Sequence, residues 1–199
     1  MDEDLKKEAD KLMKIEGNVR GEVFKFTFYY AKDKEGEEAP RLIEEKMNKL
    51  GYPFKFSDLE PLRWYRESLS VLAILVAKEL FSWTDKDIFN MGYEASKYSL
   101  LIKILMRYFV SSERVFKEAP AYWKKHFDFG DLEPVEFSEK KKYTIMRVKG
   151  YKFHPLICLY HAGYFLRIAN LTVRSKKIDV KETKCVFKGE DCNEYLITW

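Results

Sequence analysis

The sequence predicts an α+β protein in which a helical N-terminal half packs on a C-terminal four-stranded antiparallel sheet. Two observations lead to this prediction. Apolar residues recur with helical spacing over most of residues 1–129, whereas from Gly130 onward they alternate as in strands, with one helix between two strand pairs. The chain therefore divides into a helical part, residues 1–129, and a ββαββ part, residues 130–199. We expect the two parts to form one domain.

The composition is that of a globular protein. Of the 199 residues, 46% are apolar and 34% are charged, and the apolar run from Val71 to Ala77 is far shorter than a bilayer requires. A net charge of +4 is too mild to indicate nucleic acid without a basic patch. The acidic N-terminus carries no signal peptide. We therefore expect a cytoplasmic location, no membrane span and no direct contact with nucleic acid.

Six or so helices are expected in the helical part. Residues 2–15 form a charged helix, and residues 37–50 form another. Residues 22–34 are ambiguous, because alternating phenylalanines favour a strand whereas an apolar stripe at helical spacing favours a helix. We adopt the helix.

Further helices are expected before Gly130. Pro61 begins one with a strongly apolar middle. Thr84 caps the next, with an acidic residue three positions later, and the apolar positions of this helix lead on through Phe109. The last begins after the N-cap Ser111, ends near Phe127 and is interrupted at Pro120.

The C-terminal part alternates apolar and polar residues in four segments. In the first hairpin Tyr143, Ile145 and Arg147 share one face of the expected sheet. The expected strands are 133–137, 143–148, 178–187 and 194–199, with a helix over 155–170.

All three cysteines fall in this C-terminal part. Cys158 lies in the first helical turn, whereas Cys185 and Cys192 flank a Gly-Glu-Asp turn between strands. Zinc takes four ligands from thiolate, imidazole and carboxylate groups. His161, three residues after Cys158, and Glu182, three before Cys185, are both candidates for the fourth. A zinc site is one interpretation of the cluster, and three small buried apolar residues are the other.

Three motifs carry a resemblance: His154-Pro-Leu-Ile-Cys158, Glu182-Thr-Lys-Cys185 and Gly189-Glu-Asp-Cys192. Over residues 150–199 the chain resembles the 4-vinyl-reductase-type small-molecule-binding domain, which is similar to the sensors of phenol- and xylene-responsive bacterial activators. The resemblance implies a zinc ion as cofactor, and His161, suggested by its spacing after Cys158, becomes the runner-up ligand. The implied ligands are Cys158, Glu182, Cys185 and Cys192. Such a set leaves no open position for water, so the zinc is expected to be structural.

The helical part is similar, more loosely, to the opening of haem–nitric-oxide-binding (H-NOX) domains. The similar segments are Gly21-Glu-Val-Phe24, Arg63-Trp-Tyr65 and Met91-Gly-Tyr93. The subunits of the TRAPP tethering complex share that fold in a form without haem. The resemblance implies helices that enclose a hydrophobic pocket against the C-terminal sheet.

A close likeness to the haem domains would require a proximal histidine on a late helix and a Tyr-x-Ser-x-Arg motif for the propionates. The chain offers His126 and Tyr143-Thr-Ile-Met-Arg147, in which the serine is missing. Haem is therefore not expected. His126, Tyr122, Trp123 and Phe129 either border an apolar ligand pocket or, as is commoner for such rings, pack a helix on the sheet. The candidate ligand-binding residues are Phe109, Trp123, His126, Phe129 and Tyr143.

Motifs for catalysis are missing from the sequence. It contains no nucleophile motif, no Gly-rich phosphate loop and no nicotinamide or flavin fingerprint, so we do not expect an enzyme. We interpret the chain as a sensor for a hydrophobic or aromatic small molecule, acting as a homodimer that signals through a separate partner. One alternative is a ligand-free scaffold or tethering dimer similar to the TRAPP subunits. A haem-based gas sensor is the second alternative.

Overall fold

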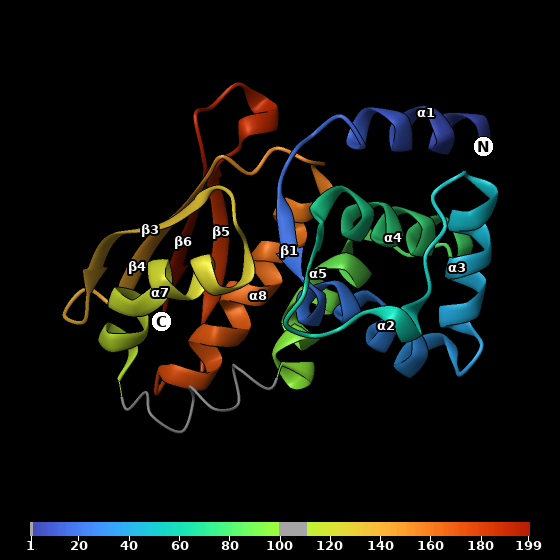
Figure 1. Cartoon of the computed structure of the whole chain (residues 1–199). Helices are drawn as coiled ribbons and strands as arrows, with labels where there is room; N and C mark the ends of the chain where they lie inside the picture. Colours follow the sequence, from blue (N-terminus) through green and yellow to red (C-terminus); the bar gives the residue numbers. More distant parts are fainter. Residues whose placement is uncertain (1, 100–110) are drawn as a thin grey trace.

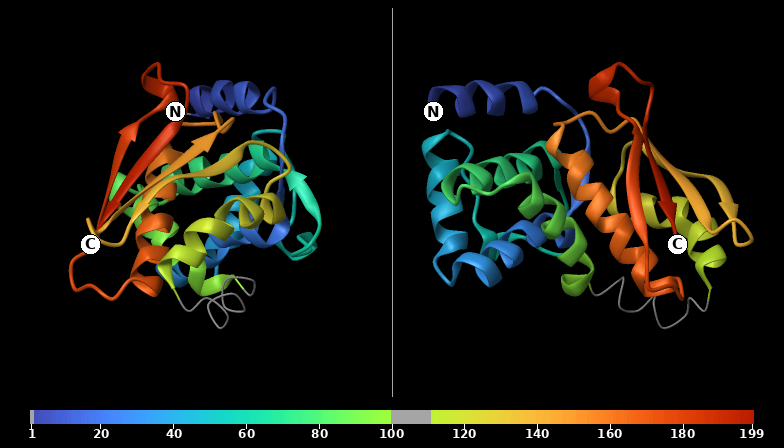
Figure 2. Two further views of the ribbon diagram at one scale, coloured as in Figure 1. Left: turned by 90° about the vertical axis from the view of Figure 1, so that its left-hand side faces the viewer. Right: turned by 180° about the vertical axis from the view of Figure 1, so that it is seen from behind.

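The structure, a computed structural model, describes residues 2–99 and 111–199. Helices of the N-terminal part lie at one end and a four-stranded antiparallel sheet lies at the other (Figure 1). Helix α8 (Leu156–Thr172) runs between the sheet and the helical group, with α5 (Asp85–Tyr98) packed along it (Figure 2). The predicted α+β class is confirmed.

The helical part begins as the sequence predicts. Residues 22–34 are helical, because the buried residues Phe24, Thr27, Phe28 and Ala31 follow helical spacing and face the core. The described helices before α5 are α1 (Asp2–Leu12), α2 (Gly21–Glu35), α3 (Ala39–Lys49) and α4 (Glu67–Leu80), with a short 3-10 turn, η1 (Phe56–Asp58).

The expected helix start at Pro61 is wrong. Pro61 lies in a turn closed by a hydrogen bond from the Arg63 amide to the Glu60 carbonyl, and α4 begins only at Glu67. Two short strands, β1 (Asn18–Arg20) and β2 (Trp64–Arg66), pair antiparallel, with Val19 opposite Tyr65. The carbonyls of residues 61 and 63 accept hydrogen bonds from the first amides of α2. Tertiary hydrogen bonding thus overrides the local preference of proline for a helix start.

Helix α5 is capped as predicted and lies unusually close to α8. The Thr84 hydroxyl accepts from the amide of Asp87, whose carboxylate accepts from the Thr84 amide. A Cβ added at Gly92 would lie 1.9 Å from the carbonyl oxygen of Tyr160. Glycine is therefore required where the two backbones touch. The predicted continuation of this helix through Phe109 lies outside the described residues.

Helix α7 (Ser112–His126) does not break at its proline. Ser111 caps it as expected by accepting from the amide of Arg114, but Pro120 sits inside a continuous helix. The predicted interruption is wrong. Proline removes one backbone hydrogen bond, and the buried side chains of Trp123 and His126 hold the following turn against the protein.

The ββαββ order is confirmed. The strands are β3 (Asp131–Ser138), β4 (Tyr143–Lys149), β5 (Asp179–Lys184) and β6 (Asn193–Thr198), with a 3-10 turn η2 (Val186–Lys188) after β5. Their spatial order is β3-β4-β6-β5, and all neighbours are antiparallel. Thr144 and Met146 point toward α7 and α8. Because strand side chains alternate, Tyr143, Ile145 and Arg147 point away from the helices.

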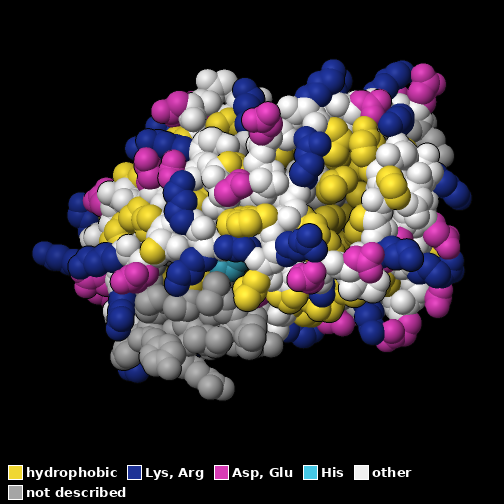
Figure 3. Space-filling view, in the orientation of Figure 1, with side chains coloured by type: hydrophobic (Ala, Val, Ile, Leu, Met, Phe, Trp, Pro, Cys, Tyr) yellow, Lys and Arg dark blue, Asp and Glu magenta, His cyan; other side chains and the backbone are white. Residues whose placement is uncertain are grey.

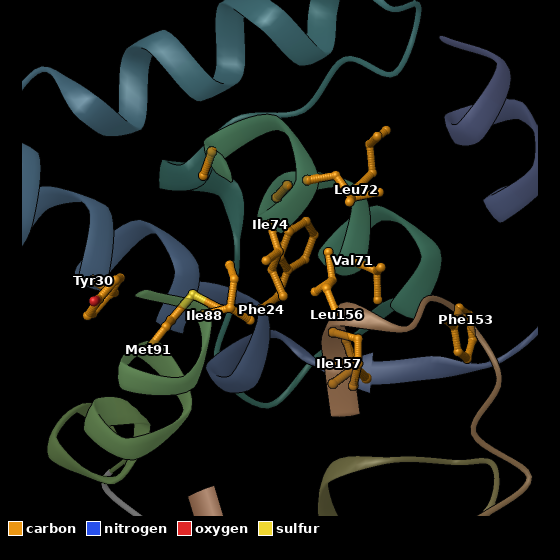
Figure 4. Close-up of a cluster of buried hydrophobic side chains, with 14 of the residues drawn as sticks. Phe24, Tyr30, Val71, Leu72, Ile74, Ile88, Met91, Phe153, Leu156 and Ile157 are labelled. Carbon is orange, nitrogen blue, oxygen red and sulfur yellow. The ribbon is translucent and has the colours of Figure 1, made fainter. Parts of the chain in front are cut away.

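The hydrophobic core joins the two parts of the chain. Helix α4 is buried on nearly all sides, from Ser68 to Ala77, and packs between the other helices. Figure 4 shows Leu156 and Ile157, from the start of α8, beside Val71 of α4. On the face seen in Figure 3, basic and acidic side chains are interspersed rather than gathered by sign. None of the described helices is long and apolar enough to cross a membrane.

Candidate functional site

Three of the four predicted metal ligands come together in what we call the thiol cluster: Cys158, Glu182 and Cys185. One ligand atom from each lies within 4.8 Å of the others, and the two Sγ atoms are 3.9 Å apart. Both thiols are buried, and Oε1 of Glu182 is buried without a hydrogen-bond partner among the described residues. Burial raises the pKa of the Cys158 thiol, and the neighbouring carboxylate raises it further. The cluster offers the donor types that metals bind.

Cys192, the fourth predicted ligand, lies outside the thiol cluster. The place beside Cys158 is taken by Asn193, whose Oδ1 lies 3.7 Å from the Cys158 Sγ. Side chains adjacent along extended chain point to opposite sides. Cys192 accordingly lies near the charges of Asp191 and Arg147. The predicted set of four is therefore incomplete.

His161, the runner-up ligand, also lies outside the thiol cluster. Its spacing of three residues on α8 puts it on the same side of the helix as Cys158, but its ring packs against Trp123 of α7 and does not join the thiol cluster. The His161 ring centroid is 5.0 Å from that of Tyr151 and 5.8 Å from that of Trp123. His161 thus belongs to a second site, inside the protein.

This second site consists of two adjoining cavities. The large cavity, of about 110 Å³, lies between α7, α8 and the sheet. The small cavity, of about 60 Å³, lies between α2, α7 and α8. Both have Tyr122, Leu132, Tyr164 and Phe165 in their walls. The two cavities are therefore neighbours separated by shared side chains.

His126 lies in the wall of the small cavity with one ring nitrogen anchored. Its Nδ1 lies 3.0 Å from the carbonyl oxygen of Tyr122, one turn earlier in α7. A carbonyl oxygen only accepts, so Nδ1 carries the hydrogen and Nε2 carries the lone pair. Burial lowers the pKa of His126, which favours the neutral ring. A neutral imidazole with a fixed tautomer is suited to binding a metal.

Two further polar groups of the small cavity have no hydrogen-bond partner among the described residues. His161 is 5% exposed, and its Nδ1 makes no hydrogen bond to any described residue. The hydroxyl of Tyr122 is likewise buried and unpaired among the described residues. Burial lowers the pKa of His161 to about 3, so its ring is neutral at ordinary pH. Unpaired buried polar groups are costly, so two of them in one cavity wall indicate a ligand or ordered water.

The candidate ligand-binding residues are only partly brought together. Trp123 and His126 line the small cavity, as predicted. Phe129 and Tyr143 line neither cavity: Phe129 packs on other aromatic rings, and Tyr143 points away from α7 and α8. Phe109 lies outside the described residues.

Sequence reasoning places Tyr122 beside His126 at a possible pocket, but it misses Tyr164 and Phe165 of the cavity walls. Tyr122 lies four residues before His126, and Tyr164 lies three after His161, so each pair shares a helix face. This spacing is a signal, but it is equally typical of aromatic residues packed in a core. Only the facing of α7 and α8 shows that the two pairs converge.

A buried glutamate adjoins the small cavity through Tyr151. Glu67, at the start of α4, is hydrogen bonded through Oε1 to the Tyr151 hydroxyl. The ring of Tyr151 in turn contacts Trp123 and His161, which line the small cavity. Burial raises the pKa of Glu67 to about 8, so the carboxyl is protonated at neutral pH. A change in the charge of Glu67 would thus occur beside Tyr151, whose ring contacts the cavity wall.

The C-terminal end of α7 is tied to the helical part. The Asn18 amide and side chain donate to the Asp128 carboxylate at 2.7 Å, and Val19 forms a bridge with Phe127. Arg20 Nε donates to the carbonyl of Lys125 at 3.2 Å. These contacts join the end of α7 to β1.

Comparison with solved structures identifies the fold. The chain is similar to an H-NOX protein from S. oneidensis in the Fe(II)NO state, with a TM-score of 0.64 and 11% identity, covering 90% of this chain and 98% of that one. It is similar to an oxygen-binding H-NOX domain related to soluble guanylate cyclases, with a TM-score of 0.64, 11% identity and coverage of 90% and 94%. A third structure, from work on haem redox potential and porphyrin distortion, has a TM-score of 0.62, 10% identity and coverage of 91% and 100%. No protein-family model matches the chain, and no curated protein does. At these identities the likeness shows a shared fold.

These comparisons correct the cofactor prediction. The sequence favours a structural zinc ion and keeps a haem-based sensor only as the second alternative. Of the three solved structures named above, two are H-NOX proteins, one of them with ferrous nitrosyl iron, and the third comes from work on haem. The thiol cluster has three described ligand residues rather than the four expected for structural zinc, so it is weaker evidence for zinc than the neighbours are against it. The predicted cofactor, a structural zinc ion without haem, is therefore contradicted by these haem-binding neighbours.

Proposed function

We propose that this chain is a haem-based gas-sensing domain, with its site between α2, α7 and α8. The proposal is supported by the H-NOX fold and, above all, by one observation: His126 lies in the wall of an interior cavity with its Nε2 lone pair free of an intrahelical bond. Haem, when bound, would supply an iron atom able to coordinate a diatomic gas.

The donor chemistry of the small cavity fits haem. Histidine and tyrosine are both known axial ligands of haem iron, and the wall offers His126, His161 and Tyr122. His126 is the best suited of these, because its hydrogen bond to the Tyr122 carbonyl fixes the orientation of the ring. The residue that would hold the iron is therefore His126.

The volume of the two cavities fits haem less well than the donor atoms in their walls do. A cavity of about 150 Å³ holds a benzene molecule, and neither cavity here reaches that size. A porphyrin would need the two cavities to join. The rings of Tyr122, Tyr164 and Phe165 stand between them, so these are the side chains that would have to move.

A conformational change caused by ligand binding would begin at α7. The cavity walls include Tyr122, Trp123 and His126, all near the C-terminal end of this helix. The bonds from Asn18 and Arg20 would carry a shift of that end to β1 and β2. We further propose that the chain acts as one domain and a homodimer, without catalysis, and signals through a separate partner. A narrower kinship with the 4-vinyl-reductase-type domain is likewise proposed, on the motifs of residues 150–199.

Titration of the purified protein with haemin tests the proposal. We expect a Soret band that saturates at one haem per chain. His126→Ala should weaken binding at least tenfold and shift the band. His154→Ala is the matched control, because His154 pairs with Glu8 away from both cavities and should leave the titration unchanged. A wild-type titration without a Soret band would overturn the proposal.

A second candidate function is direct sensing of a small organic molecule. The large cavity favours it, because aliphatic and aromatic side chains form most of its wall. Two interior cavities also weigh against a ligand-free scaffold.

A further inference from the structure

We propose that the large and small cavities together bind a short-chain aliphatic alcohol, or another neutral amphiphile with a hydroxyl head. The head would lie in the small cavity and the tail in the large one. This inference extends the second candidate function by naming the chemistry of the ligand, and it does not depend on haem.

The head group is defined by the two unpaired polar atoms of the small cavity. The Tyr122 hydroxyl can donate, and the neutral His161 ring can accept at Nδ1 when its hydrogen is on Nε2. A ligand hydroxyl satisfies both, because its oxygen accepts from Tyr122 and its hydrogen is donated to His161. An aldehyde or ketone satisfies only the tyrosine, and an alkane satisfies neither.

The head group should be neutral. Among the described residues that line either cavity there is no lysine or arginine to pair with an anion. The Glu22 carboxylate lies close enough to raise the pKa values of Tyr122 and Tyr164, after the larger effect of burial. That negative charge further disfavours an anionic head. The described wall residues therefore favour an alcohol over a fatty-acid carboxylate.

The tail is defined by the large cavity. Tyr122 lines both cavities, and its ring stands between them with those of Tyr164 and Phe165, so a tail that runs from the Tyr122 hydroxyl into the large cavity requires these rings to move aside. Val115, Ala119, Ile168 and Ala169 are among the apolar side chains there. Each methylene buried from water tightens binding by about fourfold, from about 0.8 kcal/mol per group. Affinity should therefore rise along a series of primary alcohols until the tail fills the cavity.

Calorimetric titration of the full chain, free of haem, with 1-butanol, 1-hexanol, hexanal and n-pentane tests the proposal. We expect 1-hexanol to bind tighter than 1-butanol by about fifteenfold, from the two added methylenes. Hexanal should bind about fivefold weaker than 1-hexanol, because one hydrogen bond is lost. Tyr122→Phe should weaken 1-hexanol by about fivefold and leave n-pentane unchanged.

Two further variants keep the test independent of folding. Tyr143→Phe removes a hydroxyl that faces neither cavity, and it should bind like the wild type. Ala169→Leu fills the large cavity and should abolish binding of 1-hexanol. Equal affinity for 1-butanol and 1-hexanol, or for 1-hexanol in wild type and Tyr122→Phe, would overturn the inference.

The haemin titration separates this inference from the proposed function. A Soret band without alcohol binding would leave the haem proposal standing and sink this one. Alcohol binding without a Soret band would do the reverse.

Discussion

Glu67 allows a quantitative prediction about pH and stability. The side chain is 3% exposed, and burial raises its pKa from 4.5 to about 8. Its Oε1 is bonded to Tyr151, whereas its Oε2 has no partner among the described residues. Such a rise in pKa corresponds to about 5 kcal/mol of unfolding free energy. The folded state holds this proton more tightly than the unfolded state. The stabilisation is therefore full below about pH 4.5 and is lost as the pH rises toward 8.

Glu67→Gln keeps the shape of the protonated side chain and removes its titration. We expect the variant and the wild type to have similar unfolding free energies near about pH 5. At about pH 8.5 the variant should be more stable, by up to about 5 kcal/mol. Urea denaturation at several pH values measures this difference. Glu16→Gln, at an exposed position, is the control and should show no such trend. A difference between Glu67→Gln and wild type that stays constant with pH would refute the buried, protonated carboxyl.

Two further predictions concern packing and capping. Gly163→Ala would place a Cβ 2.0 Å from the carbonyl oxygen of Phe89, so α5 and α8 must separate. We expect the unfolding free energy, measured by urea denaturation, to fall by about 3 kcal/mol. The control Asn170→Ala, at an exposed position of the same helix, should lower it by less than about 0.5 kcal/mol. An unchanged midpoint for Gly163→Ala would contradict the close approach of the two helices. Thr84→Ala removes the capping box of α5 and should lower the unfolding free energy by about 1 kcal/mol. The control Thr198→Ala, at an exposed position, should change it little, and equal effects of the two substitutions would contradict the cap.

The elements that the sequence predicts well are those with local causes. The helix over residues 22–34, the Thr84 cap and the ββαββ order all follow from spacing and capping residues close together in the chain. The strands β1 and β2 could not be predicted in this way. Each has three residues, and they pair with one another across a gap that holds two helices. Their stability comes from tertiary hydrogen bonds that no local pattern records.

The candidate site likewise has parts that local motifs predict and parts that depend on tertiary packing. Cys158, Glu182 and Cys185 were named from motifs, and the structure brings them together. Cys192 was expected beside them because it follows the same turn, but Asn193 points there instead. The small cavity depends on how α7 faces α8, which the spacing on each separate helix does not determine.

The most direct test of the central claim is the native mass of the protein purified from cells supplied with haem. We expect a mass increased by one haem per chain for the wild type and for His154→Ala. The mass of His126→Ala should be that of the bare polypeptide. A bare polypeptide mass for the wild type, or an equal haem content in His126→Ala, would contradict the assignment of the site around His126.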